Sequence, residues 1–395
     1  MYVYADHAAT TEMSEVAKNS MIQALKDQWG NPSSLHSGGQ HAKEALEAAR
    51  AQIAGLLGAQ SSEIYFTSGG SEADNQAILT AVRLGARRGK KHIITSAFEH
   101  HAIMHPLERL EKEGYEITWL PVHENGMVRP EEVAAAIRED TALVTIMYAN
   151  NEIGTLQPIA EIGRICREKK VLFHTDAVQA VGHVPVDVVR DQVDMLSLSA
   201  HKFHGPKGIG LLYARKGVNV ATLIEGGAQE RGKRAGTENL PAIIAMAAAL
   251  QDACDHMKEN TDRIVPMRER LIEELSKIPH SRLNGDRNTR VPGTVNFCFE
   301  GIEGESLLLM LDDLGIEASS GSACTSGSLD PSHVLLALGL PHEVAHGSLR
   351  LSIGEDNTPE QIEYIVQKVP EVVSFLRGIS PVWEELEKGE RPHRI

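Results

Sequence analysis

The middle of the chain alternates short apolar runs with amphipathic stretches, and this alternation limits the possible folds more than any other feature. The apolar runs include EIYFTS, KHIITS, ALVTIMY, VLFHTD and DMLSLSA. Between them lie stretches with helical spacing of apolar residues, such as NQAILTAVRLGARRG and PEEVAAAIRED. Strand, helix and strand in this order predict a mostly parallel sheet that helices cover on both faces. The sequence therefore favours an α/β fold.

Each of these apolar runs ends in polar or small residues. The clusters are 68–71, 99–101, 150–152, Asp176 and 199–202. Ligands of open parallel sheets bind beyond the carboxyl ends of the strands. We therefore expect the five clusters to meet at one site.

The pattern changes after about Leu240. The stretches PAIIAMAAALQDACDHMKEN and RIVPMRERLIEELSKI predict two helices, and GTVNFCFE and GSLRLSIG predict strands with the helix ESLLLMLDDLG between them. This order is typical of a smaller α+β domain, and 395 residues are enough for two cores. We predict a large domain over 15–258 and a small domain from 1–14 and 259–395, with a mobile loop at about 318–330.

Charge and hydropathy exclude several classes of protein. A formal net charge of -15 disfavours a nucleic-acid surface, which needs clustered Lys and Arg. The basic stretch 231–234 is open to two interpretations, a pocket for one small anion or a solvated loop. No apolar run reaches the roughly 18 residues of a membrane helix. The first ten residues lack the pattern of a secretory signal, so a cytoplasmic protein without membrane contact is expected.

The four cysteines are far apart and form no CxxC pair, which excludes a zinc ribbon and fits a reducing compartment. Cys166 and Cys298 stand among apolar residues and are predicted in the core. Cys324 stands in ASSGSACTSGSLDPS instead, where small residues bury little apolar surface. Such a position suits a nucleophile that enters a site and leaves it.

Two motifs suggest an anionic cofactor. In FTSGGSEADN a strand enters a glycine turn and a helix begins near Ser71, so its N–H groups could seat a phosphate; an ordinary capped helix is equally compatible. In SLSAHKFHGPKG, Lys202 follows a strand, beside Ser199 and His201, where a lowered pKa would allow a Schiff base. Asp176, which ends VLFHTD, would suit a pyridinium nitrogen, although a helix-capping aspartate is the alternative.

These segments resemble, in order, the conserved blocks of one enzyme family. FTSGGSEADN, AFEHHA, ANNEIGTLQPI, TDAVQAVG, SAHKFHGPKG, GGAQERGKRAGTEN, SSGSACTSGS and GSLRLSIG all resemble class-V aminotransferases, and within them cysteine desulfurases of the NifS/IscS type. The resemblance covers nearly the whole chain. It implies fold type I of enzymes that use pyridoxal 5'-phosphate, with a mostly parallel seven-stranded sheet in the large domain.

The resemblance also implies the roles of individual residues. Lys202 would hold pyridoxal phosphate as a Schiff base, Asp176 would pair with its ring nitrogen, and Gln179 would bind its ring hydroxyl. His100 would stack on the ring and move protons, with a pKa near neutrality. The phosphate would be bound by Gly70, Ser71, Ser199, His201 and, from the partner subunit of a homodimer, Thr237.

Asn151, beside the cofactor, and Arg350 would hold the carboxylate of L-cysteine, since the planar guanidinium can grip both oxygens. Cys324 would accept the sulfur as a persulfide, leaving L-alanine, and an acceptor or iron–sulfur scaffold protein would then take it. The nearest alternative is a selenocysteine lyase or another class-V enzyme of the same fold that uses pyridoxal phosphate, such as a related lyase or transaminase. A metal-binding protein is the alternative from another class, because His101 and His105 are one helical turn apart, but no HExxH or cysteine pair completes that site.

Overall fold

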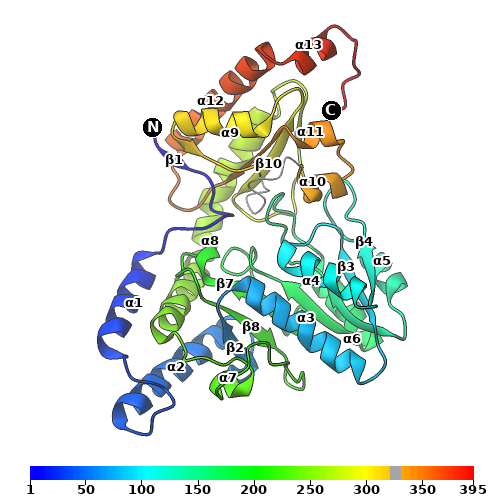
Figure 1. Ribbon diagram of the computed structural model, residues 1–395. Helices are drawn as coiled ribbons and strands as arrows, with labels where there is room; N and C mark the ends of the chain where they lie inside the picture. Colours follow the sequence, from blue (N-terminus) through cyan, green and yellow to red (C-terminus); the bar gives the residue numbers. More distant parts are fainter. Residues whose placement is uncertain (321–330) are drawn as a thin grey trace.

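The computed structural model describes residues 1–320 and 331–395. Figure 1 shows a larger part built on one wide sheet and a smaller part above it, with the long helix α8 (Leu240–Leu275) running from one to the other. None of the helices in these two ranges is long and apolar enough to cross a membrane.

The larger part contains a seven-stranded sheet, in which β8 alone runs antiparallel to its neighbours. Its strands, in spatial order, are β2 (Ile64–Thr67), β8 (Gly210–Ala214), β7 (Met195–Ser199), β6 (Leu172–Asp176), β5 (Thr141–Thr145), β3 (His92–Ser96) and β4 (Glu116–Leu120). The five apolar runs of the sequence are five of these strands. Sequence patterns did not single out β4 and β8.

Both faces of this sheet are apolar because successive strand residues point to opposite sides. Ile93 and Leu143 belong to one hydrophobic cluster, with α3 and α4, whereas their neighbours Ile94 and Val144 belong to another, with α2, α6 and α8. The covering helices are α2 (Ser37–Leu56), α3 (Gly70–Ala86), α4 (His101–Lys112), α5 (Pro130–Ala136) and α6 (Ile159–Lys169). The predicted two-sided cover of a mostly parallel sheet is confirmed.

The smaller part has its own core and two small sheets. β10 (Thr294–Phe299) lies between β12 (Ser348–Ser352) and β9 (Ser281–Leu283), and β1 (Val3–Tyr4) pairs with β11 (Ile316–Glu317). The start of the chain therefore packs with residues more than 300 positions away. The helices here are α9 (Gly304–Asp313), α10 (His333–Ala337), α11 (His342–Ala345), α12 (Pro359–Gly378) and α13 (Pro381–Glu387).

One continuous helix, α8, replaces the two helices that the sequence predicted. Pro266 lies inside it and can remove only one backbone hydrogen bond. Packing outweighs that loss, because Ile243 and Leu250 are buried in the larger core while Ile264 and Leu271 are buried in the smaller one. The predicted domain boundary at 258 falls within this helix, and the domain division stays a prediction.

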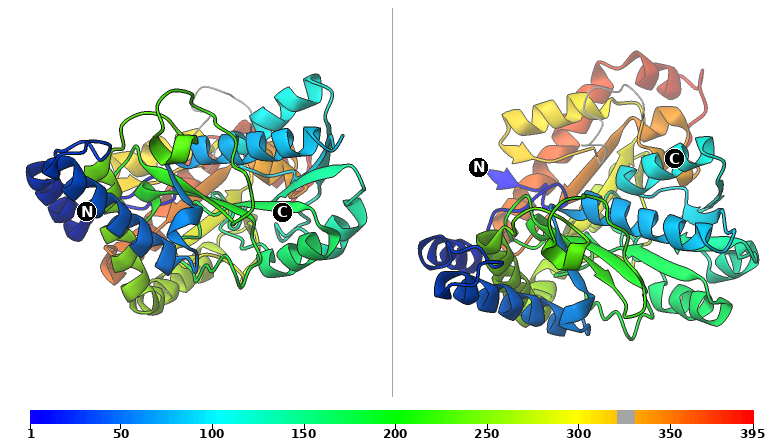
Figure 2. Two further views of the ribbon diagram at one scale, coloured as in Figure 1. Left: turned by 90° about the horizontal axis from the view of Figure 1, so that it is seen from below. Right: turned by 60° about the horizontal axis from the view of Figure 1, so that its bottom comes forward.

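One further helix, one short helical segment and two 3-10 turns complete the larger part. They are α1 (Glu15–Asp27), α7 (Gln229–Gly232) and the short 3-10 turns η1 (Ser61–Glu63) and η2 (Ala200–Lys202). Both views in Figure 2 show α1 and α2 (dark blue) together at one side of the molecule.

Candidate active site

The ends of five parallel strands place most of the predicted residues together. β2, β3, β5, β6 and β7 all run in one direction, since β2 and β7 are each antiparallel to β8 and the others are parallel to β7 or to one another. The polar segments that follow them therefore lie at one edge of the sheet, as expected for an α/β ligand site.

Lys202 lies in η2, directly after β7, and contacts the start of the chain. Its Nζ donates to the carbonyl oxygens of Ala8 at 2.5 Å and Ala9 at 2.7 Å. Gln179 Nε2 donates to the same Ala8 oxygen at 2.8 Å. His201 Nδ1 lies 3.1 Å from Thr10 Oγ1, and burial, then the charge of Lys202, lowers its pKa to about 4. The segment 8–10 thus crosses beside the lysine.

Asp176 ends β6 and is paired in register with Ser197 of β7, five residues before Lys202. Its Oδ1 accepts the N–H of Val178 at 2.9 Å. Burial raises the pKa of the Asp176 carboxyl, while the Val178 N–H and the charge of Lys202 oppose this rise. The carboxylate and the lysine are therefore close enough to interact electrostatically.

A second buried acid, which was not predicted as a site residue, lies beside Asp176. Asp74 of α3 is 1% exposed, and burial followed by repulsion from Asp176 raises its pKa well above the usual range. Its Oδ1 lies 3.6 Å from His174 Nε2. That nitrogen also lies 2.9 Å from Ser197 Oγ, and burial lowers the pKa of His174 to about 3. In the sequence Asp74 looks like an ordinary first-turn helix acid.

The start of α3 fits a phosphate. Gly69 precedes the helix and no side chain caps it, in contrast to α1, α4 and α12. A side chain at Gly70 would lie 2.6 Å from Val178 Cγ2 and 3.7 Å from Ser199 Cβ, so the helix start packs against the residues that follow β6 and end β7. Uncapped N–H groups at such a place bind anions. Ser71 is exposed and Ser199 is buried.

His100 caps α4, because its Nδ1 accepts the N–H of Ala102 at 3.1 Å. Burial, followed by the charge of Lys202, lowers its pKa to about 4. The expected pKa near neutrality is therefore wrong, because the side chain lies in a desolvated site beside a cation. A neutral imidazole whose Nδ1 accepts carries its hydrogen on Nε2.

Arg350 lies on β12 and is 2% exposed. Its Nη1 donates to the carbonyl oxygen of Asn151 at 2.9 Å, and its Nη2 to Asp6 Oδ1 at 2.8 Å. Its Nε has no hydrogen-bond partner in residues 1–320 and 331–395. The neighbouring Asn150 builds the turn, since its Oδ1 accepts the N–H groups of Glu152 and Ile153. Asp6 was not predicted as a site residue.

The basic stretch 231–234 contacts β2 and the first turn of α3. Arg231 donates to the carbonyl of Ile64 at 2.6 Å, and Arg234 pairs with Glu72 at 2.9 Å. Both side chains thus already have partners within the chain, which argues against a separate pocket for one small anion. Thr237 is exposed, and no hydrogen bond within the described ranges joins it to Lys202.

The cysteines divide as the sequence predicted, as far as they are described. Cys166 and Cys298 are buried, and burial raises the pKa of each thiol to about 12. Cys254 is partly buried. Cys324 lies outside the described residues.

The described residues on both sides of 321–330 are fixed at the site. Ser319 exchanges backbone hydrogen bonds with Arg350 at 2.6 and 3.2 Å. On the other side, Ser332 Oγ donates to Glu152, and His333 Nε2 lies 2.9 Å from the carbonyl oxygen of Glu99. Ser319 thus lies beside Arg350, and His333 lies beside the residue that precedes His100.

The metal site that His101 and His105 could form gains no third ligand from the described residues. The rings of His101 and His105 stack at 4.8 Å, and His333 lies 4.9 Å from His101. In the described ranges, no set of three His, Cys, Asp or Glu ligand atoms gathers there.

Comparison with known proteins identifies the family. A model described as aminotransferase class-V matches residues 3–365. The chain belongs to the class-V aminotransferases, in the cysteine desulfurase group. It is 52% identical to cysteine desulfurase IscS of Methanosarcina thermophila, over 96% of this chain and 94% of the relative. It is 50% identical to cysteine desulfurase IscS of Clostridium botulinum, over 98% of each chain.

Solved structures agree with this assignment. A NifS-like protein superposes with a TM-score of 0.89 at 37% identity, covering 95% of this chain and 100% of that one. A structure of SspA in complex with cysteine superposes with a TM-score of 0.79 at 35% identity, covering 90% and 100%. The predicted family and its fold type I are confirmed.

Pyridoxal phosphate is the cofactor of this family, and the donor set of the site fits it. The uncapped α3 start suits the phosphate, the buried Asp176 suits a protonated ring nitrogen, and Lys202 suits the aldehyde. The resident groups thus match the cofactor at both of its charged ends.

Proposed function

We propose that this site removes sulfur from L-cysteine, releases L-alanine and places the sulfur on Cys324. One observation carries the proposal: Ser319 pairs with Arg350, and His333 lies beside the carbonyl oxygen of Glu99. Cys324 follows Ser319 by five positions and precedes His333 by nine. An extended chain spans at most about 3.3–3.6 Å per residue, so these two contacts limit how far the thiol can lie from Arg350 and Glu99.

In this proposal the ring of pyridoxal phosphate would be held by Lys202, Asp176, Gln179 and His100. Its phosphate would be held by the N–H groups of Gly70 and Ser71, with Ser199 and His201. When bound, pyridoxal phosphate supplies an electron sink for negative charge at the substrate α-carbon. With the cofactor bound, Asp176 would keep the ring nitrogen protonated, and the Lys202 nitrogen would carry the proton to and from the substrate α-carbon.

Arg350 and Asn151 would orient the substrate by its carboxylate. Because Nη2 of Arg350 already binds Asp6 and its Nε binds nothing in the described ranges, a substrate carboxylate would use Nε and compete with Asp6 for Nη2. His100, neutral near pH 7, would act through its Nε2–H as a donor and as a stacking surface. Proton transfer from Nε2 would then need a partner of high basicity.

The sulfur step balances in atoms and electrons. The Cys324 thiolate attacks the substrate sulfur, a sulfur–sulfur bond forms, and the carbon–sulfur bond breaks with its electron pair left on carbon. That carbon takes a proton and leaves as alanine. The persulfide then passes its outer sulfur to an acceptor, such as an iron–sulfur scaffold protein or an enzyme of thio-cofactor or tRNA thiolation.

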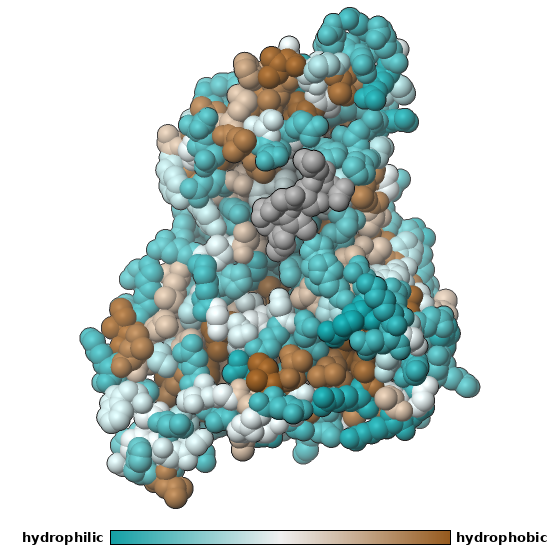
Figure 3. All heavy atoms as spheres, in the orientation of Figure 1, coloured by the Kyte–Doolittle hydropathy of each residue, from teal (hydrophilic) through white to brown (hydrophobic). Residues whose placement is uncertain are grey.

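We also propose that two copies form a homodimer in which Thr237 reaches the phosphate site of the partner. Support comes from large apolar side chains that remain exposed near α1 and α2, including Ile22, Leu25, Trp29 (81% exposed) and Leu35 (94% exposed). Figure 3 shows apolar patches over this side of the larger part. A second copy is the occupant that also accounts for the exposed Thr237. A cytoplasmic location is proposed from the sequence pattern alone.

Mass spectrometry after incubation with L-cysteine tests the sulfur step. We expect an added sulfur on the peptide that contains Cys324, and Cys324→Ala should release almost no alanine while Cys254→Ala releases it normally. Sulfur on another cysteine, or full desulfuration by Cys324→Ala, would contradict the proposal. Selenocysteine as a second substrate separates the alternative, because a selenocysteine lyase would turn over selenocysteine in Cys324→Ala as fast as in the wild type.

A further inference from the structure

Three metal-binding side chains meet in the smaller part, away from the Lys202 site. His280 precedes β9, Glu300 follows β10, and His393 lies in the segment that follows α13. One ligand atom of each lies within 4.8 Å of the other two. His393 Nδ1 is 2.7 Å from Glu300 Oε2, and His280 Nδ1 is 3.7 Å from the same oxygen. The two imidazole rings stack at 3.6 Å with an interplanar angle of 13°.

We propose that His280, Glu300 and His393 bind a divalent transition metal of the zinc class. Imidazole and carboxylate ligands suit Zn²⁺ and Co²⁺, and ligands at about 2.0–2.2 Å from a tetrahedral ion stand roughly 3.3 Å apart. The two nitrogen–oxygen distances here lie on either side of that value. Binding needs both contacts to adjust and the two stacked imidazole rings to turn, so that their nitrogens point to one ion. Three protein ligands leave the fourth position to water.

The charges around the cluster favour a cation. The Glu300 side chain is 5% exposed, so its carboxylate is costly to leave uncompensated. The nearby Arg377 interacts with this carboxylate electrostatically but forms no ion pair with it within the described residues. Its guanidinium donates to the backbone carbonyls of Pro279, His280 and Glu300 and stacks on Trp383 at 3.9 Å. These bonds instead fix the backbone of two ligand residues, as outer-shell contacts of metal sites do.

The surroundings complete the enclosure of the site. The Trp383 ring stands edge-on to both imidazoles at 5.7 Å, which shields one side from water. The N–H of Arg394 donates to Glu300 Oε1 at 2.7 Å, which orients Oε2 towards the histidines. A hydrogen-bonded clip without metal is the competing explanation, since His393 Nδ1 can donate to Glu300 and His280 Nδ1 lies 2.9 Å from the carbonyl oxygen of Ile395. The metal would have to displace this second contact.

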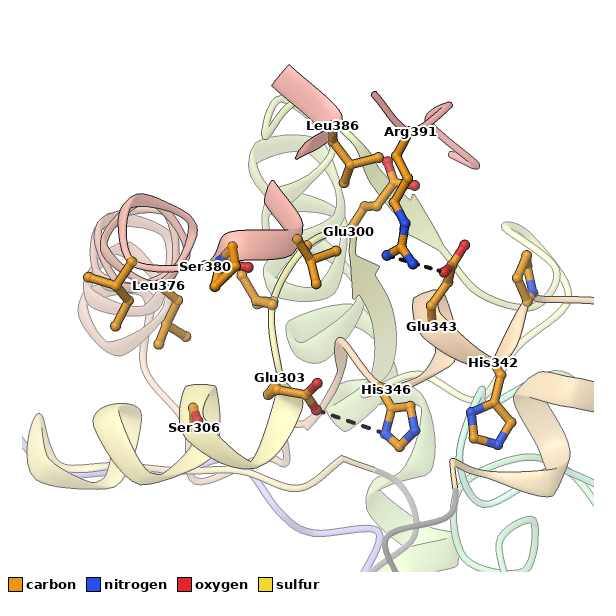
Figure 4. A pocket seen from close by; sticks show the side chains of 16 residues that line it. Glu300, Glu303, Ser306, His342, Glu343, His346, Leu376, Ser380, Leu386 and Arg391 are labelled. Carbon is orange, nitrogen blue, oxygen red and sulfur yellow. Dashed lines mark ion pairs between the residues drawn. The ribbon is translucent and has the colours of Figure 1, made fainter. Parts of the chain in front are cut away.

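Metal binding would hold the segment 391–395 against the smaller sheet. Arg391 of that segment lines a cavity of about 590 Å³ together with Glu300, Glu303 and Glu343. Figure 4 shows Arg391 directed towards Glu343, with which it pairs at 3.7 Å, and Glu300 on the same wall. The metal thus fixes one wall of this cavity, and the site acts as an anchor of the segment.

Cobalt titration of metal-depleted holoenzyme tests the site by visible absorption. We expect wild type to bind one more equivalent of Co²⁺ than His280→Gln or His393→Gln. Glutamine can keep a hydrogen bond to Glu300 but is a poor ligand for this ion. His256→Gln is the matched control, because His256 is an exposed histidine that pairs with a single aspartate, Asp252. Equal stoichiometry in wild type and His393→Gln would overturn the proposal.

Hydrogen exchange gives a second measurement that does not depend on colour. Zn²⁺ should slow amide exchange in residues 391–395 of the wild type at least about tenfold, since binding a ligand stabilises the closed state. The same addition should leave His393→Gln unchanged. Exchange in the wild type that is insensitive to zinc would show that the cluster is only a hydrogen-bonded clip, and the metal site would be wrong.

Discussion

Arg350 and Asp6 are 344 positions apart in the sequence, and their side chains form an ion pair at 2.8 Å. The pair joins β12 of the smaller part to the segment that supplies the carbonyls of Ala8 and Ala9 to Lys202. Arg350, which is proposed to bind the substrate carboxylate, is therefore linked to Lys202 through Asp6, Ala8 and Ala9. A substrate that draws Arg350 from Asp6 would loosen this segment.

Replacing Arg350 by lysine should raise the KM for L-cysteine. Lysine keeps the charge but loses the planar fork, and a charged hydrogen bond contributes about 1.5–3 kcal/mol, so kcat/KM should fall roughly tenfold to hundredfold. Initial rates over a range of cysteine concentrations measure this. Arg263→Lys, in the smaller part, is the control. An unchanged KM in Arg350→Lys would remove Arg350 from the substrate site.

Lys202→Ala should lose turnover and the visible absorbance of the bound cofactor together. The expectation follows from the position of Lys202 at the end of β7, beside Asp176 and His100. Lys207→Ala is the matched control, because Lys207 is exposed and lies five residues away. Absorbance and turnover both retained in Lys202→Ala would show that another lysine holds the cofactor.

The sequence could predict which residues follow the strands, but not the tertiary contacts that those residues make in the fold. Asp176 and Lys202 follow apolar runs, and the order of those runs implies that they meet. Asp6 and Asp74 were missed because their surroundings are tertiary: one meets β12, and the other is turned into the sheet beside Asp176. The predicted pKa of His100 was wrong for the same reason, because a sequence motif does not show how deeply a side chain is buried.

The free energy of unfolding should fall as the pH rises through neutrality, because of the buried carboxyl group of Glu99. Burial raises the pKa of its carboxyl to about 8, whereas in the unfolded chain it ionises near 4.3. Between these values the folded state holds a proton that the unfolded state has released, so stability falls as pH rises. Urea unfolding at pH 5.5, 7 and 8.5 should show this fall in the wild type and a smaller fall in Glu99→Gln. Parallel curves for the two proteins would contradict the raised pKa.

Mixed dimers can decide whether Thr237 serves its own chain or the partner. Lys202→Ala lacks the lysine, and Thr237→Glu places a negative charge where a phosphate would bind, so each homodimer should be inactive. In a mixed dimer, the chain with Thr237→Glu keeps its Lys202 and receives an intact Thr237 from its partner. Random pairing of equal amounts should then restore about a quarter of wild-type activity per chain, because half the dimers are mixed and each has one intact site.

The composition of the mixture can be controlled by co-expression with two different affinity tags, so that purified mixed dimers alone are assayed. These should reach about half of wild-type activity, with one working site in two. If Thr237 instead acted within its own chain, every site of the mixed dimer would carry one defect, and the purified species would remain inactive. Its exposed position, with no hydrogen bond to Lys202 within the described ranges, favours the first result.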